Sequence, residues 1–207
     1  MPRPAYDHIE NTLLETCKDL FLHKGIRDTE MQEIANRAGI SRSTLYRYMA
    51  DKDELAFRVA TDLLVDVINH CLADAKEPDQ NGLEKLRRFS RELAREVTER
   101  PGLARFLEEM DILYGAYQSD RPEVKLYVES MEKLMHRQAQ FLFEGLADGS
   151  IRSIEEPMRF AAILSHTIFS LAKSSTMSGL LRDTSYAATD LAEIHRAIDF
   201  MLNSVRA

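Results

Sequence analysis

The segment SRSTLYRY (41–48) carries side chains whose types and spacing suit contact with nucleic acid. At helical spacing it uses Leu45 for packing and turns its polar side chains outward. Guanidinium and hydroxyl groups are donors that read base edges and hold phosphates. Lys52 follows near the start of the next helix, where free backbone N–H groups already favour a phosphate. The outward set consists of Arg42, Ser43, Thr44, Tyr46, Arg47 and Tyr48. We expect this surface to bind DNA.

Two short helices would have to position this surface. Thr29 is expected to N-cap the first helix, with Gln32 at the capping-box position. A turn at Gly39 leads to Ser41, which is expected to N-cap the second helix. Apolar side chains at helical spacing would hold the pair at a fixed angle. This pattern is typical of a helix-turn-helix motif and covers about residues 30–49.

The charge of the chain is acidic overall but basic at this motif. The net charge is −7, from 27 Lys and Arg against 34 Asp and Glu. That balance argues against a protein that coats nucleic acid without regard to sequence. Residues 37–52, by contrast, hold four cationic side chains and a single carboxylate, that of Asp51. A sequence-specific binder needs only such a small basic patch.

The rest of the 207 residues shows helical spacing of apolar side chains and no alternating strand pattern. The fold class is therefore expected to be all-α, with about nine helices. Gly25 and Gly149 are expected to end helices as C-caps, and Pro157 to begin one. A long helix is expected from about Asp51, and a linker at Lys76–Gly82.

Other sequence features bear on the compartment. No run of 18 apolar residues could span a bilayer, and the first residues do not form a secretory signal. Cys17 and Cys71 lie inside apolar helical patterns, where reduced and buried thiols are expected. These features predict a cytoplasmic protein without a membrane partner.

The segment KGIRDTEMQEIANRAGISRSTLYRYMADKDEL (24–55) resembles the DNA-binding domain of the tetracycline-repressor (TetR) family of bacterial transcription regulators. The spacings agree continuously over about thirty residues, which makes the motif specific. Met49 stands where the family usually has phenylalanine, and it can fill the same apolar gap. The rest of the chain resembles the family in its length and all-helical plan. The matching features include Gly25, Ile34-Ala35, Ala38-Gly39-Ile40-Ser41, Leu45-Tyr46-x-Tyr48 and Lys52.

The resemblance implies roles for individual side chains. Base edges would be contacted by Gln32, Arg42, Ser43 and Tyr46. Phosphates would be held by Thr29, Thr44, Arg47, Tyr48 and Lys52. Loss of Arg42 should then relax specificity, while loss of Lys52 should weaken binding to all DNA.

The resemblance also implies an organisation and a function. Residues 1–50 would form the helix-turn-helix DNA-binding domain, and residues 51–207 a helical regulatory and dimerisation domain. The protein would be a homodimeric repressor that a small-molecule effector, here unidentified, releases from a palindromic operator. An effector bound against the long helix that joins the domains would pivot it and change the spacing of the two recognition helices.

Two apolar stretches are candidates for the dimer interface. The first, FAAILSHTIFSLA (160–172), has no formal charge and is too short to span a bilayer, so a partner subunit could cover one of its faces. The second is a stripe along residues 191–205. Two such helices per chain would form the four-helix dimer bundle that the family implies, although both could instead pack within one chain. The predicted interface consists of Phe160, Ile163, Leu164, Thr167, Leu171, Leu191, Ile194, Ile198 and Met201.

A ligand pocket has a weaker signal. Aromatic and thioether side chains line the middle helices, and two polar groups, Gln138 and His166, fall in apolar settings. Such residues form core more often than pocket, and buried polar groups find partners in the core as well as in ligands. Glu108 and Glu109 are expected to face solvent. The candidate pocket consists of Phe89, Phe106, Met110, Tyr114, Met131, Met135, Gln138 and His166.

Catalysis is not indicated. The six histidines lie far apart without metal-ligand spacing, and neither a nucleophile elbow nor a phosphate-cradling glycine loop is present in the sequence. We therefore expect no catalytic residue, no metal and no cofactor. Two alternatives stay open: a DNA-binding regulator of the same fold that answers to a protein partner, and a helical protein that uses its hairpin for protein contacts.

Overall fold

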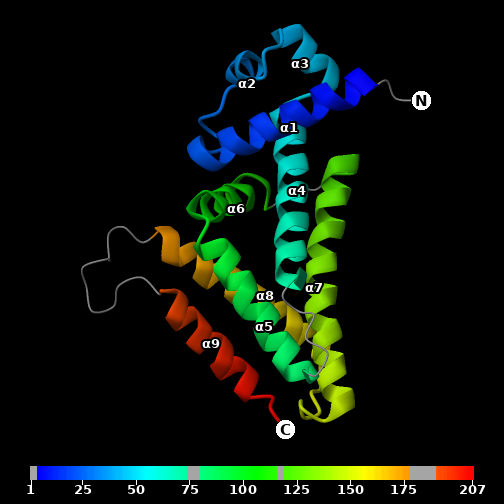
Figure 1. Cartoon of the computed structure of the whole chain (residues 1–207), viewed down its shortest axis with the longest axis vertical. Helices are drawn as coiled ribbons and strands as arrows, with labels where there is room; N and C mark the ends of the chain where they lie inside the picture. The colour runs from blue at the N-terminus through cyan, green and yellow to red at the C-terminus, as the bar shows by residue number, and fades with distance from the viewer. Residues whose placement is uncertain (1–3, 74–79, 116–118, 178–189) are drawn as a thin grey trace. The chain divides into compact units, whose positions relative to one another are not determined.

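The computed structural model describes residues 4–73, 80–115, 119–177 and 190–207. These ranges form helices joined by short connections, with one isolated antiparallel bridge between Ile151 and Arg206 (Figure 1). The all-α class predicted from the sequence is thus confirmed; of the expected linker, residues 76–79 lie outside the described residues. The helices are α1 (Pro4–Lys24), α2 (Met31–Arg37), α3 (Arg42–Tyr48), α4 (Lys52–Ala73), α5 (Gly82–Thr98), α6 (Pro101–Tyr114), α7 (Pro122–Asp148), α8 (Pro157–Met177) and α9 (Leu191–Asn203).

Several helices begin or end at the residues predicted from the sequence. Gly25 follows α1 with a φ of 97°, and Gly149 follows α7 with a φ of 78°, in the left-handed region that glycine adopts without a steric penalty. Ser41 caps α3, because its hydroxyl accepts from the backbone N–H of Thr44 at 3.1 Å. Helix α8 begins at Pro157.

The predicted cap of α2 is wrong. Glu30, not Thr29, is the N-cap residue, and it makes no side-chain capping hydrogen bond. The hydroxyl of Thr29 instead donates to the carbonyl oxygen of Gly25 at 2.6 Å, and Thr29 is fully buried. Thr29 thus stabilises the connection between α1 and α2 instead of the helix that follows it.

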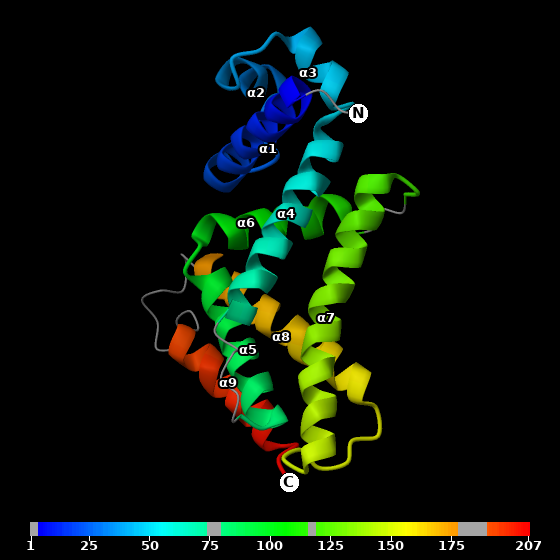
Figure 2. The same ribbon diagram turned by 45° about the vertical axis from the view of Figure 1, so that its right-hand side comes forward.

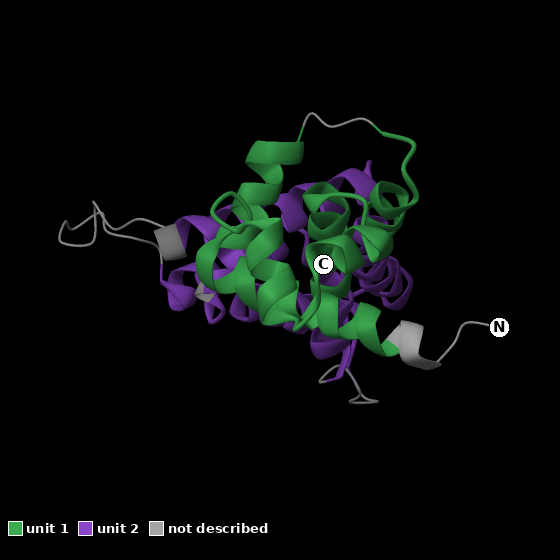
Figure 3. Cartoon of the chain, turned by 90° about the horizontal axis from the view of Figure 1, so that it is seen from above, with its two compact units in different colours: residues 1–63, 105–129 green, residues 64–104, 130–207 purple. Residues whose placement is uncertain are grey.

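The chain divides into two compact units, coloured separately in Figure 3. Unit 1 comprises Met1–Leu63 and Arg105–Glu129, and unit 2 comprises Leu64–Ala104 and Ser130–Ala207. Helices α4, α6 and α7 therefore each contribute residues to both units. The functional division expected at residue 50 stays a prediction.

Unit 1 has its core where α1 meets the helix-turn-helix and the unit's part of α6. Phe21 of α1 stacks on Phe106 of α6, with ring centroids 6.2 Å apart. Ile34 and Leu45 supply the buried contacts of α2 and α3, and Met49 is fully buried, as expected for a side chain in place of phenylalanine. This packing fixes the angle at which α3 presents its outer face.

Unit 2 is built around α5, which packs against α8 and α9 (Figures 1 and 2). Phe89 of α5 is fully buried and contacts Phe141 of α7, with ring centroids 5.7 Å apart. Gly82 lies so close to Gly145 that a methyl group on it would overlap backbone atoms of α7. The start of α5 and the end of α7 are therefore in direct backbone contact.

Both cysteines are buried and free, as expected. Burial raises the pKa of each thiol, Cys17 and Cys71, to about 12. Within the described ranges, no helix combines the length and the apolar character needed to cross a membrane.

Candidate nucleic-acid interface

Helix α3 exposes its polar side chains and buries only Leu45. Arg42, Ser43 and Arg47 are exposed, and Tyr46 keeps 42% of its surface accessible. A tyrosine this exposed contributes little to the core and can contact a partner through both its ring and its hydroxyl. The outward orientation predicted for these side chains is confirmed; their individual roles toward DNA stay predictions.

The two arginines of α3 lie over neighbouring tyrosine rings. The guanidinium carbon of Arg42 is 5.5 Å from the centroid of Tyr46, and that of Arg47 is 5.4 Å from the centroid of Tyr48. Such cation–π contacts orient a side chain but leave its N–H donors unused. In the described part of the chain, neither arginine forms an ion pair with a carboxylate. Their charges are therefore uncompensated at the surface.

A hollow of about 330 Å³ joins α2 and α3. Gln32 of α2 lines it together with Arg42 and Tyr46 of α3 and with Arg27. The structure thus brings together three of the four side chains predicted to contact base edges. The fourth, Ser43, is exposed, and its hydroxyl lies 2.9 Å from that of Ser41.

Other cations near the motif are already paired with carboxylates. Arg37 pairs with Asp19 of α1, and Lys24 pairs with Glu33 of α2 at 2.6 Å. The hydrogen bond from Lys24 lowers the pKa of Glu33, which therefore stays ionised. The positive charge available to a ligand at this surface comes from the two arginines of α3 and from Arg27, which is exposed and lines the same hollow.

Lys52 also lines the hollow between α2 and α3, and its ammonium group is bonded within the chain, so its phosphate contact stays a prediction. Its ammonium group donates to the carbonyl oxygens of Ile26 at 2.9 Å, Arg27 at 3.3 Å and Thr29 at 3.2 Å. An ammonium group has three N–H donors, and these bonds use all three. The group that was expected to hold a phosphate therefore stabilises the connection between α1 and α2. Thr29 is fully buried with its hydroxyl bonded inside the same connection, so its phosphate contact also stays a prediction.

The remaining predicted phosphate ligands lie at the edge of the exposed face. Thr44 is half-buried, and its hydroxyl lies 2.8 Å from that of Ser41 at the start of α3. Tyr48, at the other end of α3, is also half-buried. Both keep part of their surface accessible, so their phosphate contacts stay predictions.

Glu109 of α6 was expected to face solvent, but it binds the connection between α1 and α2. Its carboxylate accepts from the backbone N–H of Ile26 and, at 3.4 Å, from that of Arg27. Arg105, one turn earlier on α6, donates to the carbonyl oxygen of Leu22 at 2.6 Å. Helix α6 therefore holds the segment that leads into the helix-turn-helix. No local sequence signal indicates these bonds, because their partners lie more than eighty residues away.

A second set of bonds holds the start of α4. Arg121 makes a bidentate pair with Asp51, at 3.0 and 3.1 Å, and the hydroxyl of Tyr114 donates to Asp53 at 2.8 Å. The hydrogen bonds from Arg121 hold the pKa of Asp51 below its usual range. This carboxyl thus stays ionised and fixed beside the end of the recognition helix.

The residues proposed for a ligand pocket are divided between the two units. In unit 1, Phe106 and Met110 are buried, and the hydroxyl of Tyr114 is bonded to Asp53. In unit 2, Phe89 and Gln138 are buried, Met131 and Met135 are half-buried, and His166 is exposed. The pocket stays a prediction.

Gln138 is the one member of that set with an unsatisfied polar atom. The hydroxyl of Ser165 donates to its side-chain oxygen, while its Nε2 finds no acceptor among the described residues. Gln138 is fully buried, and the N–H donors of a buried side-chain amide are usually paired. The unpaired Nε2 of Gln138 is therefore an exception to this rule.

The residues predicted for the dimer interface differ in their exposure within the single chain, and the interface stays a prediction. Leu164, Ile194 and Ile198 are at most 1% exposed within the single chain, in which α8 and α9 pack against α5 and against each other. Ile163 is 51% exposed, and Phe200, which was not predicted, is 79% exposed. The others are half-buried: Phe160, Thr167, Leu171, Leu191 and Met201.

Residues 13–59 match the family model described as bacterial regulatory proteins of the tetR family. The search of curated proteins found no match.

Solved structures of regulators have a similar fold. The transcriptional regulator FadR from Bacillus subtilis, solved with stearoyl-CoA, has a TM-score of 0.70 at 16% identity, over 94% of this chain and 98% of FadR. AibR, solved with isovaleryl coenzyme A and operator DNA, has a TM-score of 0.64 at 19% identity, over 96% of this chain and 98% of AibR. RolR, solved with resorcinol, has a TM-score of 0.67 at 19% identity, over 97% of this chain and 89% of RolR.

The family match includes α2, α3 and the start of α4, so it covers the exposed face of α3 but not the residues of α6 and Arg121 that help to position it. Residues 13–59 are thus similar to the bacterial regulatory proteins of the tetR family, and the similarity of fold to solved regulators extends over nearly all of the chain.

Proposed function

We propose that this protein is a sequence-specific DNA-binding transcriptional regulator that reads its operator with α3. The observation that carries the proposal is the joint exposure of Gln32, Arg42 and Tyr46 around one hollow on a helix-turn-helix. An arginine fork binds guanine edges, a glutamine amide binds adenine edges, and a tyrosine ring can contact a thymine methyl group. The uncompensated charge of Arg42 and Arg47 attracts the phosphate backbone.

The regulator acts as a homodimer on a palindromic operator. Helices α8 and α9 each carry a large apolar side chain that is more than half exposed in the described chain, Ile163 at 51% and Phe200 at 79%. A second copy of the chain would bury both in a bundle of four helices. Two recognition helices related by the dimer axis then read two half-sites, one in each of two successive major grooves.

A small-molecule effector controls DNA binding, and repression is the sign of regulation that we propose. Support comes from the solved relatives that hold stearoyl-CoA, isovaleryl coenzyme A or resorcinol. A ligand that moved α6 would also move the connection into the helix-turn-helix, because Glu109 and Arg105 bind that connection directly. Such a ligand releases DNA only if it binds the non-competent arrangement more tightly than the competent one.

Selection from random-sequence duplexes tests the DNA-binding part of the proposal. The full chain should enrich a palindrome whose half-sites are about one helical turn apart. The enriched site should bind with a steep salt dependence, since phosphate contacts release counterions. Recovery of duplexes with no shared sequence after repeated rounds would contradict sequence-specific recognition.

A separate assay tests the effector. The complex with the enriched operator would be titrated with stearoyl-CoA, isovaleryl coenzyme A and resorcinol, and thermal melting of the free protein would be measured in parallel. An effector must both raise the melting temperature and weaken operator binding. A compound that stabilises the protein without changing operator affinity is not an effector, however tightly it binds.

A further inference from the structure

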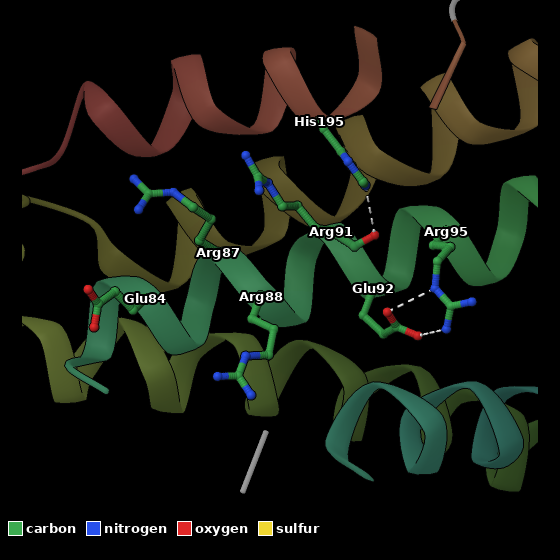
Figure 4. A pocket seen from close by; sticks show the side chains of 7 residues that line it. All are labelled: Glu84, Arg87, Arg88, Arg91, Glu92, Arg95 and His195. Carbon is green, nitrogen blue, oxygen red and sulfur yellow. Dashed lines mark hydrogen bonds and ion pairs between the residues drawn. The ribbon is translucent and has the colours of Figure 1, made fainter. Parts of the chain in front are cut away.

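A cleft with a volume of about 320 Å³ lies on α5 of unit 2 (Figure 4). One face of α5 forms most of it, and His195 of α9 closes one side. Figure 4 shows Arg87 and Arg91 extending toward the side of α9, while Arg88 and Glu92 extend from the opposite side of the helix. The lining residues are Glu84, Arg87, Arg88, Arg91, Glu92, Arg95 and His195.

The arginines form a row along the helix. Positions 87, 91 and 95 follow the four-residue spacing that keeps side chains on one face, whereas Arg88, one residue after Arg87, extends from the opposite side of the helix. With a rise of about 1.5 Å per residue, the row from Arg87 to Arg95 spans about 12 Å. This is longer than a single phosphate or carboxylate group, so one small anion would engage only part of it.

The residues that line the cleft are cationic in sum, with four arginines and two glutamates in a protein of net charge −7. Two further carboxylates, those of Asp199 and Glu99, pair with these arginines. Arg87 and Arg91 share one carboxylate, that of Asp199, with Arg87 Nε 3.1 Å from its Oδ1. A single arginine paired with Asp199 would be enough to hold α9 against α5, so this contact does not require both Arg87 and Arg91. Among the described residues, the buried Nε of Arg91 has no acceptor, so the ion pair with Asp199 leaves part of this guanidinium unsatisfied.

At the other end of the row, Arg95 pairs with Glu92, with Arg95 Nε 3.0 Å from Glu92 Oε2. The imidazole of His195 lies between the two ends, with its Nε2 3.3 Å from the carbonyl oxygen of Arg91. The pairs at Asp199 and Glu92 hold the guanidinium groups of Arg87, Arg91 and Arg95 in place before any ligand arrives. A site whose donors are already ordered loses less entropy on binding.

We propose that this cleft binds a small molecule of nucleotide size that carries a diphosphate group. Guanidinium forks match phosphate oxygens in pairs, which favours arginine over lysine in sites of this kind. A diphosphate is long enough to engage more than one arginine of the row, and the volume falls at the lower end of the range for small-molecule sites. All lining residues belong to unit 2, whereas α3 belongs to unit 1, so this inference does not depend on DNA binding.

Isothermal titration calorimetry of the full chain tests the site with four probes: ADP, pyrophosphate, inorganic phosphate and adenosine. We expect ADP and pyrophosphate to bind once per chain, inorganic phosphate to bind at least tenfold more weakly, and adenosine not to bind. Equal affinity for ADP and pyrophosphate would show that the site recognises the phosphates alone. Tighter binding of ADP would show that the nucleoside also contacts the cleft. Either result supports the proposal.

Two variants and one control locate the binding. Arg91→Gln and Arg88→Gln should each weaken pyrophosphate binding about tenfold or more, the cost of losing a charge-assisted pair. Arg88→Gln is needed because Arg91 also ties α5 to α9. Arg159→Gln, on an exposed arginine of α8 paired with Glu156, should change the affinity less than about twofold. No saturable binding by the wild type, or unchanged affinity in both cleft variants, would overturn the proposal.

Discussion

Arg42 and Lys52 are both cations of the DNA-binding region, but their surroundings give them different roles. Arg42 lies on the outer face of α3 over the ring of Tyr46, with its N–H donors unused by the described chain. Lys52 donates to three backbone carbonyl groups between positions 26 and 29. The exposure of Arg42 can be predicted from the sequence, because Leu45 is the apolar residue of a short helix and its position determines which side chains face outward. The sequence could not predict the bonds of Lys52, whose acceptors lie more than twenty residues away.

Arg42→Ala should reduce discrimination between operator and scrambled DNA. Loss of a bidentate base contact costs about 1–3 kcal/mol, which is about a tenfold to hundredfold loss of specific affinity. Fluorescence anisotropy on both duplexes measures the ratio. Arg159→Ala is the control, because its side chain lies in unit 2. If Arg42→Ala weakened binding to both duplexes by the same factor, Arg42 would be a phosphate ligand.

Lys52→Gln should lower stability and leave the salt dependence of DNA binding unchanged. The substitution removes a charged donor from three carbonyl groups, and we expect the free energy of unfolding to fall by about 1–3 kcal/mol. Chemical denaturation measures this change, and the slope of log affinity against log salt measures the phosphate contacts. A slope reduced by about one, with stability unchanged, would return Lys52 to the phosphate role that was expected from the sequence.

Because of Asp51, the stability of this region should depend on pH. The hydrogen bonds from Arg121 make the pKa of Asp51 lower in the folded state than in the unfolded state. The ionised carboxylate therefore stabilises the fold above its unfolded pKa of about 4. This stabilisation is lost as the pH falls through the folded pKa. The side chain is 46% exposed, so the contribution should stay below about 1 kcal/mol. Arg121→Gln should therefore cost stability at pH 6 and progressively less toward pH 3. Arg137→Gln, whose partner is the amide of Gln140, should show no such trend.

At the scale of elements, the helix ends were predictable where one residue type determines them. Gly25 and Gly149 have positive φ, Ser41 caps α3, and Pro157 begins α8. The start of α2 was not predictable in this way, because the hydroxyl of Thr29 could bond forward to a helix or backward to Gly25. The contact of α6 with the connection after α1 depends on tertiary packing, which periodicity does not report.

Gly25→Ala should destabilise the protein more than Gly39→Ala. Both glycines have positive φ, so each substitution carries the strain of a left-handed residue, about 1–2 kcal/mol. A methyl group at Gly25 would also overlap the carboxylate of Glu109, whereas the space around Gly39 is open. Denaturation of the two variants isolates the contact with α6. Equal costs would mean that Glu109 moves aside freely and that α6 does not hold this connection tightly.

At the scale of the whole molecule, the stripe along α9 illustrates what periodicity can and cannot predict. The stripe correctly marked Ile194 and Ile198 as the apolar face of a helix, but that face is covered by the same chain. Hydrophobic spacing identifies a buried face and says nothing about which subunit buries it. The structure shows that the predicted Ile163 is exposed in the single chain, and it adds Phe200, which the stripe did not mark.

Phe200→Glu should convert the proposed dimer to a monomer. A charge placed in an apolar helix bundle between subunits would lack a partner, and its desolvation opposes association. Light scattering after size-exclusion chromatography measures the mass. Ile112→Glu, at a position that is 59% exposed on α6, is the matched control and should leave the mass unchanged. If Phe200→Glu remained dimeric, the interface would lie elsewhere.

The most direct measurement is fluorescence-anisotropy binding of the full chain to DNA that flanks its own gene, against scrambled DNA, at two salt concentrations. We predict tight binding to the flanking DNA, saturation at two dimers per duplex or fewer, and much weaker binding to the scrambled sequence. Raising the salt should weaken both, because phosphates are contacted in each case. Weak and equal binding to both duplexes, followed by failure of random-sequence selection to enrich a site, would contradict the account.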